Sequence, residues 1–454
     1  MAPGDRPLPS QSLSRRFYSV LTWLVQPLLR RKLRRRGQAE PGYLMRIDER
    51  FGRYDAEMRA ALARCAGAPR LWIHAVSLGE TRAAAILVPA LRERWPGVQL
   101  LLTHSTATGR AEGQRLMREG DLQLWLPWDT PACVGRFVQA ARPDLGLVME
   151  TEVWPNLMAA CRTAGVPAVL VNARLNDKSL RGAQRWPALM APAYAGFTRI
   201  LAQSDEDAAR LRLAGGGDVV VTGNLKYDAR PSMPQLEKAA RWRAGLNKPV
   251  VMLASSREGE EQALLARLAA LREAGGTWVD AVQWMIVPRH PQRFDAVRVL
   301  AEQAGWHVSV RSAWDDARGP ADTAHEPPVR RPVLWLGDTL GEMALYYGLA
   351  DLALLGGSFE PLGGQNLIEA AACECPVVMG PHTFNFAEAA QLAESAGAAR
   401  RAADLAQALD RVRELVLEKP AGLQAMRAAS QDFAHHRRGA VSATVRELAS
   451  LLPL

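Results

Sequence analysis

Cysteine is scarce in this 454-residue sequence, and its spacing excludes two kinds of site. The five cysteines are an odd number without a CxxC pair: Cys65, Cys133, Cys161, Cys373 and Cys375. They give neither a disulfide framework nor a paired metal motif, so a reducing cytoplasm is the expected setting. His74 and His104 each end an apolar run, but no third ligand stands at the spacing of a metal triad. Both histidines are therefore expected to be structural, and no metal is expected.

Two nucleotide-binding motifs are also missing. The sequence contains no GxxxxGKS and no GxGxxG after an apolar run, which argues against an ATP-binding P-loop and a dinucleotide fingerprint. The formal net charge of +9 is modest for this length, and much of it lies near the start. The basicity is thus local, and no nucleic-acid partner is expected.

An apolar segment, Phe17–Leu29, lies between two basic clusters near the N-terminus. It is interrupted by Gln26-Pro27 and is too short to cross a bilayer, which takes about 20 apolar residues. A secretory or twin-arginine signal is disfavoured because the basic run Arg30–Arg36 follows in place of a small-residue cleavage site. The segment is typical of a helix in the interface of an anionic membrane, where each cation contributes about 1 kcal/mol. The alternative is a helix packed on its own domain.

Short apolar runs alternate with helix-length segments along the rest of the chain, as in α/β proteins with parallel sheets. Seven runs predict a first sheet: Leu71–Val76, Val98–His104, Leu122–Pro127, Asp144–Glu150, Pro167–Ala173, Arg199–Ser204 and Asp218–Asn224. Six more predict a second sheet: Pro249–Ser255, Gln283–Pro288, His307–Val310, Pro332–Asp338, Asp351–Gly357 and Cys375–Gly380. The segment Trp314–Arg331, rich in Asp, Pro and charge, is expected to be a surface loop.

Two folded domains are expected, because the chain exceeds what one hydrophobic core usually organises. The expected parts are a membrane anchor at 1–45, a first domain at 46–228, a linker at 229–248 and a second domain at 249–454. The last helices are candidates to pack back on the first domain. Ligands of open parallel sheets bind at the carboxyl ends of the strands, so two such domains predict a cleft between them.

Glycines and small polar residues occupy several strand-to-helix junctions of the second domain. These junctions are Ser255–Glu260, Pro288–Pro291, Gly337–Glu342, Gly356–Ser358 and Gly363–Glu369. Backbone N–H groups at a helix start can approach an anion, Arg289 can add a charge-assisted bond, and Glu369 could accept hydrogen bonds from ribose hydroxyls. Each junction is a weak signal alone, since glycine turns are common in α/β proteins. Together they predict a ligand site at one edge of the sheet.

Carboxylates predominate at the corresponding junctions of the first domain. The candidate residues there are Glu80, Glu150, Glu152, Asn172, Arg174 and Lys226. Glu80 follows Gly79 at a predicted strand-to-helix turn. Its alternative role is a first-turn glutamate favoured by the helix dipole, worth some tenths of a kcal/mol. For Glu150 or Glu152 the alternatives are a buried acid paired with Arg174 and an N-terminal charge on the helix after Pro155. Lys226 is by default a solvated lysine.

Six segments taken together resemble a known family. They are HAVSLGE (74–80), METEVWPNL (149–157), GNLKYD (223–228), PRHPQRF (288–294), LGDTLGEM (336–343) and GGQNLIEAAACECPVVMGPHTFNF (363–386). The sequence resembles the 3-deoxy-D-manno-octulosonic acid (Kdo) transferases that act on lipid A precursor in Gram-negative bacteria, along nearly its whole length. This implies a GT-B fold, with two Rossmann-like doubly wound domains facing a central cleft and an N-terminal membrane-interface helix. It also implies CMP-Kdo as donor, a lipid A precursor as acceptor, and inversion without metal or cofactor. The implied location is peripheral, on the cytoplasmic face of the inner membrane.

The resemblance also assigns candidate roles. Glu80 matches the general base, while Glu150, Glu152 and Lys226 match positions that stabilise the transition state, with the choice between the two glutamates open. The candidate CMP-binding residues are Ser255, Ser256, Pro288, Arg289, His290, Gly341, Glu342, Met343, Asn366, Leu367, Ile368 and Glu369. The candidate acceptor-side residues are Ser77, Gly79, Asn172 and Arg174. Leu367-Ile368 departs from the family, which commonly has proline and leucine there.

Glycosyl transfer agrees with this distribution of residues. Attack by a sugar hydroxyl needs a carboxylate to take the proton, whereas a phosphate leaving group departs as an anion and needs positive or N–H partners. Two alternatives stay open. One is a GT-B enzyme with a different nucleotide-sugar donor, and the other is a nucleotide-binding membrane adaptor without turnover.

Overall fold

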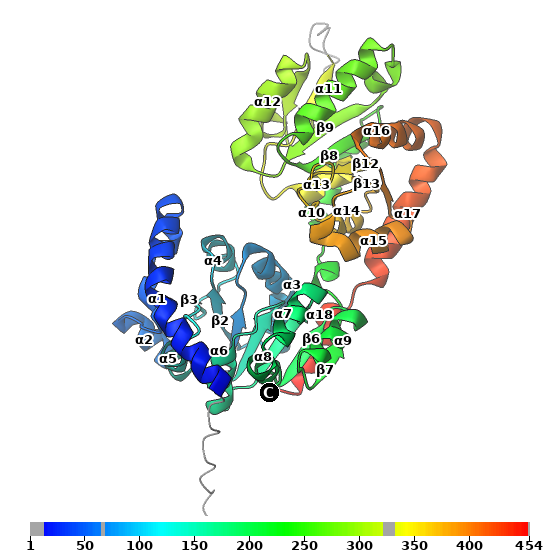
Figure 1. Ribbon diagram of the computed structural model, residues 1–454. Coiled ribbons are helices and arrows are strands. Elements are labelled where there is room, and N and C mark those ends of the chain that lie inside the picture. Colours follow the sequence, from blue (N-terminus) through cyan, green and yellow to red (C-terminus); the bar gives the residue numbers. More distant parts are fainter. Residues whose placement is uncertain (1–12, 65–68, 321–331, 453–454) are drawn as a thin grey trace, which may run out of the picture. The chain divides into compact units, whose positions relative to one another are not determined.

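The computed structural model describes residues 13–64, 69–320 and 332–452 (Figure 1). The chain divides into two compact units, one made of Met1–Asp228 with Arg438–Leu454 and the other of Ala229–Arg437. Each unit contains one seven-stranded sheet whose strand pairs are parallel. The predicted fold class, two Rossmann-like sheets preceded by an N-terminal helix, is confirmed.

The first sheet forms from all seven apolar runs expected of it. Its strands are β1 (Arg70–His74), β2 (Gln99–His104), β3 (Leu122–Trp125), β4 (Leu145–Met149), β5 (Ala168–Ala173), β6 (Arg199–Ala202) and β7 (Val219–Val221). Their order is β3-β2-β1-β4-β5-β6-β7, so the winding reverses between β1 and β4. Such a reversal is where open α/β sheets bind ligands.

The second sheet contains one strand more than expected. Its strands are β8 (Val250–Ser256), β9 (Gln283–Pro288), β10 (His307–Val310), β11 (Val333–Leu336), β12 (Leu352–Leu355), β13 (Val377–Met379) and β14 (Ala399–Arg401). They lie in the order β10-β11-β9-β8-β12-β13-β14. The unexpected strand, β14, is a three-residue edge strand that contains two arginines. Because an edge strand is solvated on one side, it needs no apolar run, and β14 was therefore not predicted.

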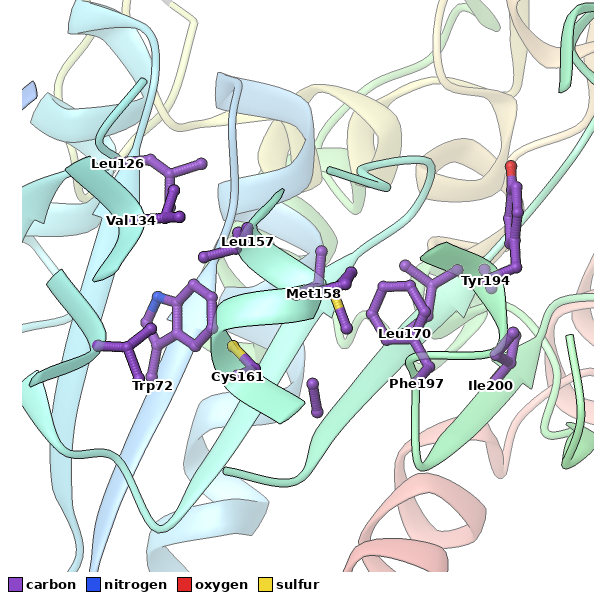
Figure 2. Close-up of a cluster of buried hydrophobic side chains, with 14 of the residues drawn as sticks. Trp72, Leu126, Val134, Leu157, Met158, Cys161, Leu170, Tyr194, Phe197 and Ile200 are labelled. Carbon is purple, nitrogen blue, oxygen red and sulfur yellow. The ribbon is translucent and has the colours of Figure 1, made fainter. Parts of the chain in front are cut away.

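The first sheet is covered on both faces, which explains the nearly continuous apolar character of its strands. Successive strand residues point to opposite faces: Trp72 enters one buried cluster, while Leu71 and Ile73 enter another. Figure 2 shows part of the cluster around Trp72, with Met158 and Phe197 also labelled. Packed side chains therefore cover both faces of the sheet, and a ligand site can form at the ends of its strands.

Helices of the first unit precede its first strand or connect its strands. They are α2 (Ala56–Ala63), α3 (Leu78–Arg94), α4 (Ala107–Gln114), α5 (Pro131–Ala141), α6 (Pro155–Thr163), α7 (Asp177–Gln184), α8 (Pro187–Tyr194) and α9 (Asp205–Leu213). The last helix, α18 (Ala440–Ala449), also belongs to this unit. The Asp228 carboxylate accepts hydrogen bonds from the backbone N–H groups of Gly439 (2.6 Å) and Val441 (2.5 Å), and Leu448 is buried in the same cluster as Leu71.

Helices of the second unit are α10 (Met233–Arg243), α11 (Glu260–Glu273), α12 (Phe294–Gln303), α13 (Met343–Leu349), α14 (Leu367–Ala372), α15 (Ala387–Ser395), α16 (Leu405–Arg413) and α17 (Pro420–His436). Most of the segment expected as a linker, 229–248, is helix α10. This helix packs against α13, and its residues Ala239 and Trp242 are buried. Residues 229–248 therefore form part of the second unit.

The expected surface loop Trp314–Arg331 begins in the core, and that expectation was wrong for its first residue. Trp314 is buried and makes edge-to-face contacts with Trp242 (centroids 5.9 Å apart) and Trp335 (5.3 Å). Its indole Nε1 donates to the Ser309 hydroxyl at 2.9 Å. The residues that follow Trp314 in the sequence are charged, so the burial of this one large aromatic side chain was not expected. Residues 321–331 of the expected loop lie outside the described residues.

Helix α1 (Leu13–Ala39) is continuous through Pro27, which removes only one backbone donor. One side packs on the first unit, where the Ser19 hydroxyl donates to Asn156 Oδ1 at 3.0 Å and the Arg30 guanidinium lies over the Phe51 ring at 4.2 Å. The other side exposes seven large apolar residues: Leu13, Phe17, Val20, Leu21, Trp23, Leu24 and Leu28. No helix in the described part of the chain is long and apolar enough to span a bilayer.

We expect Trp314→Ala to lower the free energy of unfolding by about 3 kcal/mol or more, because it removes a buried indole that two other tryptophans contact. Trp186→Ala is the matched control, since that indole is 62% exposed, and it should change stability little. Calorimetric melting of both variants measures the difference. Equal melting temperatures would show that Trp314 is not a core residue.

Candidate active site

Glu80 lies in the first turn of α3, directly beyond the carboxyl end of β1 and beside the reversal between β1 and β4. The Ser77 hydroxyl caps α3 by accepting from the Glu80 N–H at 3.4 Å. The Glu80 carboxylate in turn accepts from the Val76 N–H at 2.7 Å through Oε2 and from the Ser77 hydroxyl at 3.1 Å through Oε1. This resembles a capping box, so the capping role considered from the sequence is present in the geometry. It also fixes the carboxylate in one orientation.

The electrostatic surroundings of Glu80 go beyond those of a surface cap. Burial raises the pKa of its carboxyl group to about 7, the Val76 hydrogen bond opposes this, and the carboxylates of Glu152 and Glu150 add to the increase. A carboxyl group with a pKa near neutrality is suited to accept a proton at physiological pH. Capping alone does not require this environment.

Glu150 follows β4 with a left-handed backbone (φ 57°) and is buried. Its Oε2 accepts from Arg174 Nε at 3.0 Å, and its Oε1 lies 3.5 Å from Lys226 Nζ. Arg174 follows β5, and Lys226 belongs to the turn Leu225–Asp228 beyond β7. The structure therefore brings three residues from distant parts of the sequence together, and Lys226 is not the solvated lysine that its default interpretation suggested.

Glu152 has a different environment from Glu150. Its Oε2 accepts from the indole Nε1 of Trp154 at 2.8 Å, and no cation pairs with it among the described ion pairs. Burial raises the pKa of its carboxyl group, the Trp154 bond opposes the change, and Glu150 adds to it. The two glutamates that the sequence could not tell apart thus differ in their partners.

The remaining candidates of this unit support the loops. Gly79 lies in the first turn of α3 beside the cap residue Ser77. Asn172 is buried, and its Oδ1 accepts from the Leu225 N–H at 3.0 Å. His74 and His104 are buried inside the sheet, and burial lowers their pKa values to about 3 and about 4. They are neutral near pH 7, as structural histidines are.

The second unit places its first candidates, Ser255, Ser256 and Pro288–His290, at the ends of neighbouring strands β8 and β9. Ser255 has φ 54° and its hydroxyl lies 3.9 Å from Met343 Sδ, whereas the buried Ser256 hydroxyl donates to Glu261 Oε1 at 2.8 Å. Ser256 is thus committed to an internal bond. Pro288 pairs with Ser256 across the strands, and the Arg289 N–H donates to the Ser256 carbonyl at 3.0 Å.

Several cations gather where β9 ends. Burial lowers the pKa of the His290 imidazole, and the guanidinium groups of Arg257 and Arg289 lower it further. This local positive potential, with a half-buried Arg289, is suited to an anion.

The segment after β11 is held by internal bonds. Glu342 accepts hydrogen bonds from Arg311 at 2.9 Å and from the Thr339 hydroxyl, and the Gly341 carbonyl accepts from Gln235 Nε2 at 2.8 Å. Met343 is the first residue of α13. The Glu342 carboxylate is therefore already paired within the protein. A ligand contact from this segment would come from the backbone of the turn.

Asn366 caps α14, and its Oδ1 accepts from the Ile368 N–H at 3.2 Å. The preceding Gly363 has φ 90°, and a Cβ there would lie 2.3 Å from Asn385 Nδ2, so only glycine fits. The side chains of Leu367 and Ile368 are buried, which explains why other apolar residues can replace the family's usual pair at these positions. Glu369 is exposed.

Two residues that were not named as site candidates from the sequence organise these strand ends. The buried Glu260 carboxylate accepts from the N–H groups of Gly357 (2.7 Å), Arg257 (2.9 Å) and Phe359 (3.2 Å), and so joins the loops after β8 and β12. Gln203 follows β6 and bonds to both Asn172 and Asn224. Each follows an apolar run at the same sheet edge as the recognised motifs, which was the available signal. In the described residues, no three His, Cys, Asp or Glu side chains gather as a metal ion would require.

The raised pKa of Glu80 has a consequence for stability that does not depend on any substrate. The protonated form favours the folded state, so the stability that Glu80 contributes is complete below about pH 4.5 and is lost as the pH rises through about 7. We therefore expect Glu80→Gln to melt at a higher temperature than the wild type at pH 8 and at nearly the same temperature at pH 4. Glu57→Gln, in the first turn of α2 and exposed, is the control. An equal difference at both pH values would contradict the burial argument.

Comparisons with known proteins identify the family of this chain. Residues 45–229 match the family described as 3-deoxy-D-manno-octulosonic-acid transferase (kdotransferase). The 3-deoxy-D-manno-octulosonic acid transferase of Bordetella pertussis is 46% identical over 96% of this chain and 97% of its own, and that of Haemophilus influenzae is 30% identical over 94% and 96%.

Solved structures support the fold alone. A glycosyltransferase from Rickettsia africae matches with TM-score 0.53 and 12% identity over 85% of this chain and 98% of that one. The UDP-GlcNAc 2-epimerase from Neisseria meningitidis matches with TM-score 0.56 and 14% identity over 84% and 100%. With the two sheets and the relatives' coverage taken together, this GT-B chain belongs to the 3-deoxy-D-manno-octulosonic acid transferase family of glycosyltransferases.

Proposed function

We propose that this chain transfers Kdo from CMP-Kdo to a hydroxyl group of the lipid A precursor, with inversion and without a metal ion. The observation that carries the proposal is a carboxylate with a pKa near 7, fixed at the winding reversal of the first sheet, in a chain that belongs to the Kdo transferases. The proposed reaction requires both units, because the base and the anion-binding loops belong to different ones.

Glu80 is the proposed general base. An ionised carboxylate has about four acceptor positions, and Val76 and Ser77 occupy two of them. The others remain for the acceptor hydroxyl, whose proton Glu80 would take as the oxygen attacks the anomeric carbon. A single displacement of this kind inverts the configuration at that carbon.

The leaving group, CMP, departs as a phosphate anion and needs no proton donor. Arg289 and the N–H groups at the start of α14 are the proposed partners of that charge. In this proposal they supply the positive character that a metal ion supplies in other transferases. Gly341 and Met343 would contact the nucleotide from the neighbouring strand end.

Glu150 is the proposed stabiliser of positive charge that develops at the anomeric carbon as CMP leaves. Arg174 and Lys226 hold its carboxylate from two sides, so it needs no reorganisation during the reaction. Glu152 would act on Glu80 instead, since its carboxylate helps to raise the pKa of the base. The partners of the two glutamates favour this division of roles.

Helix α1 is the proposed contact with the cytoplasmic face of an anionic inner membrane, where the lipid acceptor lies. Its exposed residues Leu13, Phe17, Val20, Leu21, Leu24 and Leu28 recur at helical spacing and form one apolar stripe. The basic run Arg30–Arg36 continues the same helix. An apolar stripe joined to cations is typical of interfacial helices.

We expect Glu80→Gln to lower turnover of CMP-Kdo and lipid A precursor about 10²-fold to 10⁴-fold, because glutamine cannot take the proton. In the wild type, kcat/KM should rise with pH through about 7, since Glu80 must be ionised to act. Glu152→Gln removes a charge that raises this pKa, so the midpoint should move to lower pH. Glu57→Gln should match the wild type.

Two outcomes of these kinetics would count against the assignment. Turnover by Glu80→Gln within a few-fold of the wild type would make Glu80 a helix cap only. Absence of transfer by the wild-type protein, with CMP binding retained, would favour another donor or an adaptor.

We expect replacing Phe17, Trp23 and Leu24 together by glutamine to reduce binding to phosphatidylglycerol vesicles at least about tenfold, because each large apolar side chain contributes about 1.5 kcal/mol or more when buried. The matched control replaces Leu213, Met233 and Leu340, which are equally exposed but lie outside α1. Vesicle co-sedimentation measures both. Equal binding by the two triple variants would place the membrane contact elsewhere.

A further inference from the structure

The Lys226 ammonium group lies beside the Glu150 carboxylate although the two residues follow strands that are not neighbours in the sheet. Glu150 follows β4, whereas Lys226 follows β7, three strands away in the same sheet. Three spacings of about 4.8 Å amount to about 14 Å, yet Lys226 Nζ lies 3.5 Å from Glu150 Oε1. The lysine and glutamate side chains span part of this distance. The bond from the Leu225 N–H to Asn172 Oδ1 shows that the chain after β7 also passes back across β6 to β5.

Asn172 holds this returning segment at β5. The register of β5 shifts between Leu170 and Ala173, and Asn172 has φ 54°, a conformation that asparagine tolerates better than most residues. This places its Oδ1 3.0 Å from the Leu225 N–H and its carbonyl 2.8 Å from Gln203 Nε2. The residue before Lys226 is thus tied to β5.

Gln203 and Asn224 complete the connection at β6. Gln203 Nε2 donates to the Asn172 carbonyl, and Gln203 Oε1 accepts from Asn224 Nδ2 at 2.9 Å. Asn224 Oδ1 then accepts from the Lys226 N–H at 3.0 Å. Three amide side chains therefore link β5, β6 and the Lys226 turn in an unbroken series of hydrogen bonds.

We propose that Asn172, Gln203 and Asn224 form an amide relay that positions the Lys226 ammonium against Glu150. The inference rests on the proposed function, because it assigns these residues to the support of that catalytic pair. They are positioning residues, since their bonds run to the backbone of the Lys226 turn and to one another.

Backbone strain and an unmet donor mark this position as specialised. Asn172 combines a left-handed backbone with a buried Nδ2 that has no hydrogen-bond partner in the described residues. Both features are unfavourable for folding and are retained where a particular geometry is needed. An aspartate or a leucine at Asn172 would not reproduce the neutral acceptor that the Leu225 N–H meets.

The test is a double-mutant cycle between Gln203 and Lys226. We expect Gln203→Leu to lower kcat for Kdo transfer about tenfold to hundredfold, as a misplacement of about 1 Å does, with the KM for CMP-Kdo nearly unchanged. In a Lys226→Met background the same change should have an effect of about twofold or less, because the residue that it positions is already lost. Gln203→Glu, which keeps the side-chain volume but loses the Nε2 donor, should behave like Gln203→Leu.

Gln123→Leu is the matched control. Gln123 lies on β3, and its Nε2 donates to the Arg110 carbonyl at 2.8 Å, so the variant loses a comparable amide bond away from Lys226. It should retain turnover, and its effect should add to that of Lys226→Met. Additive effects of Gln203→Leu and Lys226→Met, or normal turnover of both Gln203 variants, would overturn the relay. Failure of the proposed function would show differently, as wild-type protein without Kdo transfer.

Discussion

Three carboxylates lie close together beyond the ends of the strands of the first sheet, so the residues around them must offset the repulsion between negative charges. The carboxylates of Glu150 and Glu152 raise the pKa of Glu80, and that of Glu150 raises the pKa of Glu152. Each of the three has different partners. Glu80 accepts two hydrogen bonds from residues close in sequence, Glu150 pairs with two cations, and Glu152 accepts from an indole N–H.

The second unit uses a carboxylate for a different purpose. Glu260 is not a candidate ligand-binding residue, because its carboxylate accepts hydrogen bonds from three backbone N–H groups of two loops. These bonds hold the glycine-rich loops in place. Burial raises the pKa of its carboxyl group, and those bonds oppose the change. The first unit thus groups three acids beyond the ends of its strands, whereas the second unit uses an acid to join two loops.

Much of the fold was accessible from the sequence because buried parallel strands are continuous apolar runs. Thirteen of the strands carry that signal, whereas β14, with two arginines at a solvated edge, does not. The burial of Trp314 was not predicted because it also lacks an apolar run. Its neighbours in sequence are polar, and its partners Trp242 and Trp335 come from elsewhere in the chain. Local composition cannot reveal a contact that depends on tertiary packing.

The candidate site was predicted in part for a related reason. Residues such as Glu80 and Arg289 follow strands of the two different sheets, so the topology alone brings each to the strand ends of its own sheet. The pairing of Arg174 with Glu150 was one of the alternatives considered from the sequence. The pairing of Glu150 with Lys226 was not, because it depends on a loop that returns across two strands. The distinction between Glu150 and Glu152 likewise depends on side-chain direction, which spacing does not determine.

The position of α18 has a consequence for synthesis on the ribosome. Leu448 and Leu452 pack on the face of the first sheet that carries Leu71 and Ile73, although the ribosome makes them after the whole of the second unit. The second unit is contiguous and can fold before them, while the first unit stays incomplete until α18 is made. The unit that contains Glu80 therefore begins before the second unit and is completed after it, so a chain cut before α18 would lack part of the packing of the first sheet.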